Sequence, residues 1–416
     1  MSSLAQHLLK LGCVVTGSDR AENEQTEKLR KLGATVYVPH NAQNVGNAKL
    51  VVKTSAVPQD NPEVQFALDH NIPVILREQL LGELFDNFSE RIAVCGTHGK
   101  TTVTAMLHHV LERCGVSHAA FIGGEYEGQN YFNGVHTVVA EACEYNRSFL
   151  QLHPTVCVCL NVEFDHPDCY KNQADVEQSF EKLFAQSEKV VLSSAHGNLW
   201  RGAEFFGERG VTAANVTLQN GRAHFDLFVE GEYVCRAKLS VCGVHNVKNA
   251  LAVVAVAKIL KLPLLQVAQA LYTFKGVDRR WTEHNGRLNV VCDYAHHPTE
   301  IETSVQTAKS LCKGRVICVF QPHTYSRTLA FFPQFVSCFD GADQIVYLPV
   351  YSAREKLIRG ATAYQLYKLA KKQGKNTKYF ADFGRCAEYL KRVATQEDMI
   401  VLVGAGDVNK LAEYLV

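Results

Sequence analysis

The chain has 416 residues, of which 47% are apolar and 20% are charged, and its 43 basic and 42 acidic side chains give a formal net charge of +1. This length predicts two or three domains with their own cores, and it excludes a disulfide-stapled miniprotein and a disordered chain. Because the charges balance, the sequence lacks the strong basic field that sequence-independent binding of nucleic acid requires.

The cysteines and the N-terminus indicate the compartment. The 14 cysteines are scattered, without the Cys-x-x-Cys spacing that zinc sites use. Five lie inside short apolar runs, and we expect buried, reduced thiols there: Cys95, Cys157, Cys159, Cys292 and Cys318. The first residues lack the pattern of a signal peptide, and no apolar run approaches the roughly 20 residues of a membrane span. We therefore expect a cytoplasmic protein with no membrane partner.

Short apolar β-rich runs alternate with helical periodicity along the chain, which predicts α/β layers around mostly parallel sheets. In the first segment, a helix from Leu4 leads into strands within CVVTGSD, KLVVKTS and IPVILR. The second opens with RIAVCG at residues 91–96, continues through TVVAEAC, TVCVCLN and KVVLSS, and reaches the helix NVKNALAVVAVAKIL.

The third segment begins near Leu288 with LNVVCDYAHHP and continues through RVICVFQPH, QIVYLPV and MIVLVGAGD to a closing helix. Polar stretches at residues 86–90 and 279–287 are interpreted as linkers. Polar clusters follow six of the predicted strands, and ligands of parallel α/β sheets bind beyond such strand ends. We therefore expect one large site between the domains.

The sharpest motif is the loop between a predicted strand and a predicted helix, Gly96, Thr97, His98, Gly99, Lys100, Thr101 and Thr102. Its glycines let backbone N–H groups and the helix N-terminus face a phosphate. Lys100 would neutralise the β- and γ-phosphate oxygens, and Thr101 would offer a hydroxyl to Mg²⁺. The alternative interpretation is a glycine-rich turn with a threonine N-cap.

Two more clusters contain candidate metal or nucleotide ligands. Glu141 and His166 follow neighbouring apolar strands, where a carboxylate and an imidazole suit Mg²⁺ held through phosphates. Their neighbours Glu144 and Asp168 are interpreted as solvated or structural. A third group, His245, Asn246 and Asn249, opens a long apolar helix, where Asn is most often a cap but can also read the edge of a base.

The last cluster lies in the third segment and comprises Asp293, Tyr294, His296, His297, His323, Tyr325 and Arg327. One of the two adjacent histidines is expected to be structural. Arg327 could hold a carboxylate or phosphate with two parallel hydrogen bonds. Without further knowledge, these residues indicate a polyanionic substrate handled beside ATP.

Taken together, the motifs GTHGKTT, EACEYNRSFL, NVEFDHPDCY, GVHNVKNA, GVDRRW, DYAHHPTEI, FQPHTYSRT and GAGD, in this order, resemble the Mur ligases of peptidoglycan synthesis. The resemblance runs from Met1 to the C-terminus and is strongest to the branch that uses L-alanine. It implies a Rossmann-like domain for the UDP end of the substrate at residues 1–88, a central ATPase domain with a phosphate loop at 89–287, and a Rossmann-like domain that brings the amino acid at 288–416.

The resemblance also implies a reaction. ATP phosphorylates the lactyl carboxylate of UDP-N-acetylmuramate, and the amine of L-alanine attacks the resulting acyl phosphate to leave an amide, ADP and phosphate. The enzyme is expected to act on these small molecules in the cytoplasm, as a monomer or a homodimer. Family members begin with a strand and a glycine-rich loop that end at the Met-Ser where this chain opens. We therefore expect the first domain to lack that strand and loop in this sequence. Either the start was placed too late or the protein lacks part of its UDP pocket, and we favour the misplaced start.

Residue roles follow from the same resemblance. Lys100 and Thr101 would hold the γ-phosphate and its Mg²⁺, while Glu141 and His166 would serve the metal ions. On the nucleotide side, the adenine would lie near His245, Asn246 and Asn249, and Arg280 would approach from the domain junction. Predicted substrate-binding residues are Ser18, Asp19, Ser55, Tyr294, His296 and Arg327, and the predicted catalytic residues are Lys100, His166, His296 and Arg327.

Three alternatives remain at this point. A murein-peptide ligase attaches a recycled tripeptide to the same nucleotide sugar, and folylpolyglutamate synthases share the fold but differ around the lysine of the phosphate loop. The third alternative is a relative that binds nucleotide without turnover. Pro167 and Thr324 stand where other residues are usual in the family, and they affect the expected specificity rather than the chemistry.

Overall fold

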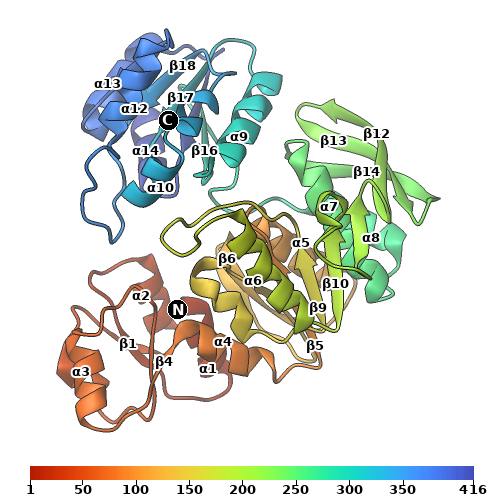
Figure 1. The fold of residues 1–416 in the computed structure, drawn as a ribbon, viewed down its shortest axis with the longest axis vertical. Helices are drawn as coiled ribbons and strands as arrows, with labels where there is room; N and C mark the ends of the chain where they lie inside the picture. Colours follow the sequence, from red (N-terminus) through yellow and green to blue (C-terminus); the bar gives the residue numbers. More distant parts are fainter.

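A computed structural model describes residues 1–416, except for the side chain of Asn285. Three α/β units follow one another along the chain, and Figure 1 shows the N-terminal and C-terminal units on either side of the central one. The predicted α/β layers are confirmed, and the two larger sheets also contain antiparallel strands at their edges. Within the described part of the chain, no helix is both long and apolar enough to cross a membrane.

The N-terminal unit contains two separate pairs of short parallel strands, β1 with β2 and β3 with β4. The predicted strands are confirmed, but each is three residues long because it pairs along one edge only. Helices α1 and α4 pack on the central unit, where Leu4 and Phe85 join its core. The elements are α1 (Ser2–Lys10), β1 (Thr16–Ser18), α2 (Glu24–Lys31), β2 (Thr35–Tyr37), η1 (Ala42–Val45), β3 (Val51–Lys53), α3 (Pro62–Asp69), β4 (Val74–Leu76) and α4 (Arg77–Phe85).

The central unit is built on a ten-stranded sheet with the order β14-β13-β12-β11-β10-β9-β5-β8-β6-β7. Its middle strands are apolar runs because helices cover both faces. The elements are β5 (Glu90–Cys95), α5 (Lys100–Arg113), β6 (His118–Tyr126), β7 (Gln129–Phe132), β8 (Thr137–Glu141), η2 (Tyr145–Gln151), β9 (Val156–Cys159), α6 (Gln173–Ala185), β10 (Lys189–Ser193), η3 (Ser194–His196), β11 (Glu204–Gly207), β12 (Val211–Gln219), β13 (Arg222–Val229), β14 (Glu232–Cys242), α7 (His245–Ile259) and α8 (Leu264–Thr273).

The predicted strands of this sheet are β5, β8, β9 and β10, and the others were not predicted. Strands β12, β13 and β14 form an antiparallel meander at its edge. Their turns carry Asn220-Gly221 and Glu230-Gly231, with φ near +50° at the first residue and above +70° at the glycine. Such left-handed pairs form the two-residue turns of β-hairpins, so these dipeptides are the signal that could have revealed the meander.

The C-terminal unit has a six-stranded sheet with the order β15-β16-β20-β17-β18-β19 and a core on each face. The prediction of a linker at 279–287 is wrong in part, because Thr282–Asn285 forms β15 and pairs antiparallel with β16. This strand is polar because it lies at the sheet edge. The elements are β15 (Thr282–Asn285), β16 (Asn289–Asp293), α9 (Pro298–Leu311), β17 (Val316–Phe320), α10 (Tyr325–Ala330), α11 (Gln334–Ser337), β18 (Gln344–Tyr347), α12 (Ala363–Lys372), β19 (Thr377–Tyr379), α13 (Phe383–Val393), β20 (Met399–Val403), η4 (Val408–Lys410) and α14 (Leu411–Leu415).

A histidine pair in the central core makes stability depend on pH. His108 of α5 is buried, stacks on Phe132 and has its Nδ1 atom 2.8 Å from Nε2 of His118. Burial lowers the pKa of His108 to about 3, so the folded protein keeps this ring neutral while the unfolded chain protonates it near its ordinary pKa of about 6.5. The unfolded state therefore binds more protons between these values, and stability falls as the pH falls through this window.

We expect His108→Gln to flatten this dependence. Urea titrations from about pH 7 to about pH 4 should show the wild-type free energy of unfolding falling more steeply than that of the variant, by up to a few kcal/mol. His153→Gln, at an exposed histidine, should keep the wild-type slope. Equal slopes for the wild type and His108→Gln would contradict the burial argument.

Candidate active site

The loop between β5 and α5 has the geometry of a phosphate-binding loop. Gly96 and Gly99 have φ of +138° and +84°, which bring the backbone round to the start of α5. The loop is held by Asn161, whose side chain accepts from the backbone N–H of His98 at 2.7 Å and donates to its carbonyl at 3.1 Å. Backbone amides and a helix N-terminus then face the same space, which suits a phosphate group.

The side chain of Lys100 lies in a largely buried ionic cluster beside this loop. Its Nζ atom is 2.8 Å from Oε2 of Glu144 and donates to the carbonyl of Gly96 at 2.6 Å. Burial by itself would lower the pKa of Lys100, but the Glu144 carboxylate raises it above its ordinary value. Nε2 of His166 lies 3.4 Å from the other oxygen of Glu144. The lysine is therefore charged and held ready for an anion.

Glu144 corrects the sequence interpretation. We expected a solvated or structural carboxylate, but its side chain is only 3% exposed and joins the predicted residues Lys100 and His166. Burial would raise the pKa of Glu144, whereas Lys100 lowers it, so the carboxylate stays charged. Sequence spacing could not show this role, because Glu144 follows β8 while Lys100 follows β5, and only the parallel pairing of these strands joins them.

Thr101 and Glu141 form a second pair at the start of α5. The Thr101 hydroxyl donates to Oε2 of Glu141 at 2.8 Å. Gly123 of β6 leaves room for this carboxylate, since a Cβ there would lie 2.1 Å from the same oxygen. A hydroxyl and a carboxylate are oxygen ligands of the kind that Mg²⁺ takes beside a phosphate, so the pair fits the predicted metal.

The predicted adenine-side residues open α7 next to the phosphate loop. Asn246 is buried and donates to the carbonyl of Cys242, while Asn249 donates to Asn246. The Oδ1 atom of Asn249 lies 3.0 Å from the position of a Cβ on Gly99, so this side chain touches the loop. His245 is exposed at the helix start.

The C-terminal unit contributes a buried arginine that reaches the central unit. Arg327 donates from Nε and Nη2 to the two oxygens of Asp165, at 2.9 and 3.1 Å, and both side chains are about 95% buried. Burial alone would raise the pKa of Asp165, but Arg327 holds it well below its usual range. Arg327, which was predicted to hold a substrate anion, thus already has a protein carboxylate as its partner. This ion pair joins the central and C-terminal units.

Glu300 of α9 is a second junction residue, and no specific role was predicted for it. Its carboxylate contacts Nδ1 of His98 at 3.2 Å and lies 3.7 Å from Arg280, and it accepts from the backbone N–H of His296 at 3.0 Å. Arg280 also stacks over the ring of Tyr294. The predicted residues His98, Arg280, Tyr294 and His296 are therefore brought together around one carboxylate that holds the phosphate loop against α9.

A cavity of about 110 Å³ lies between the Lys100 cluster and the C-terminal unit. Its walls include His166, Asp168, His323, Arg327 and Arg354. It is bounded by charged groups of both signs, which suits a small zwitterion. Asp168 therefore lines this cavity, whereas the sequence analysis expected it to be solvated or structural.

The predicted residues of the N-terminal unit lie in that unit's own loops. Ser18 ends β1 and donates to Glu63 at 2.6 Å, and Asp19 accepts from the backbone N–H of Arg20. Ser55 follows β3. The hydrogen bonds of Ser18 and Asp19 join them to neighbours in the same unit rather than to the Lys100 cluster, so the structure leaves their predicted role as a prediction.

Three family descriptions match successive parts of the chain. They are the Mur ligase family catalytic domain at residues 1–89, the Mur ligase middle domain at 94–257 and the Mur ligase glutamate ligase domain at 279–406. A UDP-N-acetylmuramate–L-alanine ligase of Clostridium acetobutylicum is 36% identical over 99% of this chain and 94% of its own length. The corresponding ligase of Caldanaerobacter subterraneus is 37% identical over the same shares.

Solved structures agree with these matches. The crystal structure of a UDP-N-acetylmuramate–alanine ligase from Thermotoga maritima has a TM-score of 0.86 and 31% identity, and the match covers 100% of this chain and 95% of that one. A murein peptide ligase from Psychrobacter arcticus shares the fold with a TM-score of 0.73 at 21% identity, over 100% and 95% of the two chains. The family matches, full-length identities and shared fold together show that this chain belongs to the Mur ligase family.

Proposed function

We propose that this protein is an ATP-dependent ligase that joins L-alanine to UDP-N-acetylmuramate during the cytoplasmic synthesis of peptidoglycan precursors. The observation that carries the proposal is the Lys100–Glu144–His166 cluster, whose His166 shares a cavity with Arg327 at the domain junction. The substrate assignment is supported by relatives named for the L-alanine reaction, which are 36% and 37% identical along almost the whole chain.

The residues around the loop fit a magnesium-bound triphosphate. Thr101 and Glu141 would hold one metal ion and His166 a second, and such ions when bound offset phosphate charge and polarise phosphoryl oxygens. The ammonium of Lys100 would exchange its contact with the Gly96 carbonyl for the β- and γ-phosphate oxygens, while the α5 N-terminus supplies backbone N–H donors. Asn249, against Gly99, and Arg280, at the junction, would lie on the nucleoside side.

The proposed chemistry has two displacements. A carboxylate oxygen of the sugar's lactyl group attacks the γ-phosphorus, and the bond from that phosphorus to the bridging oxygen breaks to release ADP. The amine of L-alanine then attacks the carbonyl carbon, and the carbon–oxygen bond to phosphate breaks as nitrogen loses a proton. The reaction brings anions together, so the charges of Lys100 and Arg327 lower the barrier chiefly by electrostatic stabilisation and by positioning.

The domain junction would position the amino acid. The cavity of about 110 Å³ has room for a small zwitterion, and Arg354 in its wall would face the carboxylate, while Arg327, held by Asp165, adds positive charge to the same wall. Burial lowers the pKa of His296 to about 3, so this ring stays uncharged at neutral pH and adds no positive charge near the incoming ammonium group. The small volume favours a single amino acid as the amine donor.

Phosphate release tests the proposal. The protein is incubated with ATP, Mg²⁺, UDP-N-acetylmuramate and one amine donor at a time. The same assay is run on a version of the protein that is extended upstream of Met1. We expect release with L-alanine, and release about 10- to 200-fold weaker with glycine or L-serine, because a pocket distinguishes one methyl group by about 1–3 kcal/mol. Release that requires the tripeptide, or nucleotide binding without release, would replace the proposal by the recycling ligase or by an inert relative.

Gly123→Ala tests the metal assignment. The added methyl group would occupy the position of the Glu141 carboxylate and push it away from Thr101. We expect phosphate release to fall about 10- to 100-fold, and the Mg²⁺ concentration for half-maximal rate to rise. Gly384→Ala, where the added carbon meets nothing closer than 3.4 Å, should change neither quantity. An unchanged Mg²⁺ dependence in Gly123→Ala would remove Glu141 from the metal site.

A further inference from the structure

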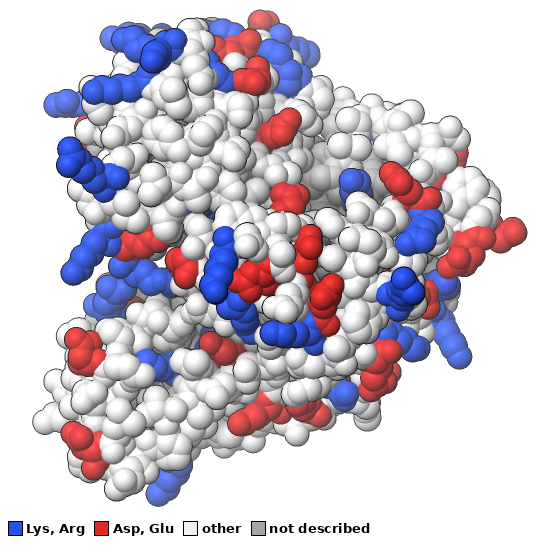
Figure 2. Space-filling view, in the orientation of Figure 1, with Lys and Arg blue, Asp and Glu red and all other residues white. Residues whose placement is uncertain are grey.

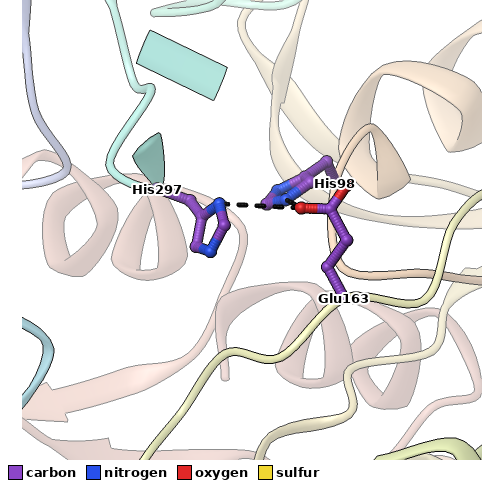
Figure 3. A group of neighbouring side chains, drawn as sticks. All are labelled: His98, Glu163 and His297. Atoms are coloured by element: carbon purple, nitrogen blue, oxygen red, sulfur yellow. Dashed lines mark hydrogen bonds and ion pairs between the residues drawn. The ribbon is translucent and has the colours of Figure 1, made fainter. Parts of the chain in front are cut away.

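Three side chains at the junction of the central and C-terminal units form a cluster apart from the proposed Mg²⁺ ligands. Figure 3 shows His98 of the phosphate loop and His297, just before α9, both directed at Glu163, which lies beyond β9. One ligand atom from each lies within 4.8 Å of the other two. Oε2 of Glu163 is 3.3 Å from Nε2 of His98 and 3.9 Å from Nδ1 of His297.

We propose that His98, Glu163 and His297 bind a zinc-class divalent transition metal that ties the phosphate loop to the C-terminal unit. Two imidazoles and one carboxylate are a ligand set that Zn²⁺ takes at sites with an open fourth position. Tetrahedral bonds of about 2.0–2.1 Å place ligand atoms about 3.3–3.4 Å apart. The His98–Glu163 distance already matches this spacing. The His297–Glu163 distance of 3.9 Å is longer, so His297 has to move closer to the other two ligands when the metal binds.

The side chains around the cluster are placed as the outer partners of metal ligands are placed. Nδ1 of His98 faces Oε1 of Glu300 at 3.2 Å, so one carboxylate orients the ring while its other nitrogen points to the cluster. Metal-binding histidines are commonly held in this way. Glu163 is itself oriented by the Thr299 hydroxyl, which donates to it at 2.9 Å.

His297 is a polar ring whose contacts the described residues do not complete. Its side chain is about 94% buried, and its Nε2 atom has no hydrogen-bond partner among the described side chains and backbone. Its Nδ1 atom receives a long 3.4 Å contact from the backbone N–H of Thr299. Buried polar atoms are normally satisfied. The unpartnered atom is Nε2, whereas the atom that faces Glu163 is Nδ1, so Nδ1, with its long contact from Thr299, is the nitrogen available to a metal.

A cavity gives the cluster access and room for a fourth ligand. The cavity has a volume of about 410 Å³ and is lined by Glu163, His297 and Thr299 together with apolar residues such as Phe331. A water molecule or a substrate atom could reach the metal from this side. Because His98 and His297 belong to different units, a bound metal would hold these units together and slow nucleotide exchange.

Cobalt binding tests the site directly. Nucleotide-free protein is titrated with Co²⁺ in excess Mg²⁺, and the visible absorption of four-coordinate cobalt is followed. His297→Asn removes the imidazole but keeps a side chain that caps α9, and Glu163→Gln removes the charge but keeps an acceptor for Thr299. We expect one site in the wild type, and Co²⁺ affinity at least about tenfold weaker in both variants. His153→Asn, at a histidine paired with Asp86, should bind as the wild type does.

A second arm measures turnover. Micromolar Zn²⁺ should inhibit phosphate release by the wild type, a chelator should restore it, and both variants should resist the inhibition. This arm depends on the proposed ligase activity, whereas cobalt binding does not, so their failures can be told apart. Equal Co²⁺ affinity in all four proteins, or a six-coordinate spectrum in the wild type, would overturn the proposal.

Discussion

Lys100→Ala is expected to reduce ligation by about 10³-fold or more, the largest loss of any single substitution considered. One preorganised group that stabilises developing charge contributes about 10²–10³ in rate, and groups at a transferring phosphoryl contribute up to about 10⁵. Lys100 is the charged residue of the loop and is held beside it by Glu144. The rate of phosphate release with saturating ATP, UDP-N-acetylmuramate and L-alanine measures the loss.

The same substitution leaves Glu144 as a buried carboxylate without its lysine, and breaking a buried pair typically destabilises a protein by about 3–5 kcal/mol. Lys100→Ala/Glu144→Gln separates the two effects, because it should recover stability but not activity. Urea unfolding at pH 7 gives the stability of each protein. Lys189→Ala, at an exposed lysine on β10, is the control and should behave as the wild type. Normal turnover by a folded Lys100→Ala protein would refute the proposed mechanism.

Asp165→Asn is expected to have the second largest effect, on stability and on activity together. It leaves the Arg327 guanidinium buried without an anionic partner, at a cost of about 3–5 kcal/mol. Because the pair joins the central and C-terminal units, we expect loss of their docking before global unfolding. Activity should fall about 10²-fold, since the misplaced arginine no longer faces the substrate.

A double-mutant cycle tests this coupling. Arg327→Met alone leaves Asp165 buried and unpaired, whereas Asp165→Asn/Arg327→Met removes both charges and should be more stable than either single variant. Asp226→Asn, which breaks the exposed pair with Arg236, is the matched control and should show a smaller change. Additive effects of the two substitutions at the junction would mean that Asp165 and Arg327 do not act as a pair.

Features that depend on residues close together in the sequence were predicted correctly. The phosphate loop was found because seven consecutive residues carry its geometry, and the structure gives Gly96 and Gly99 the backbone that the motif requires. The buried cysteines of the central strands are confirmed for the same reason, since each lies in a local apolar run. The antiparallel meander was missed because its strands are partly exposed and polar, although its turn dipeptides were visible.

Residues whose partners are distant in sequence were not predicted. No role in the site was predicted for Glu144, Glu163 or Glu300 individually, because in the sequence each is an ordinary carboxylate near the end of a strand or helix. Burial distinguishes them: Glu144 is paired with Lys100, and Glu300 with His98 of another unit. These contacts depend on strand order and on the packing of one unit against the next, which local patterns do not encode.

The amino-acid sequence alone determined the α/β class, the phosphate loop and the family resemblance, because these depend on periodicity and on the order of short motifs. Only the tertiary structure decided which carboxylates serve Lys100, Arg327 and His98. The physical reason is that a charged side chain acquires its role from the groups buried with it, and Asp165 and Arg327 become partners only when two domains exclude water between them.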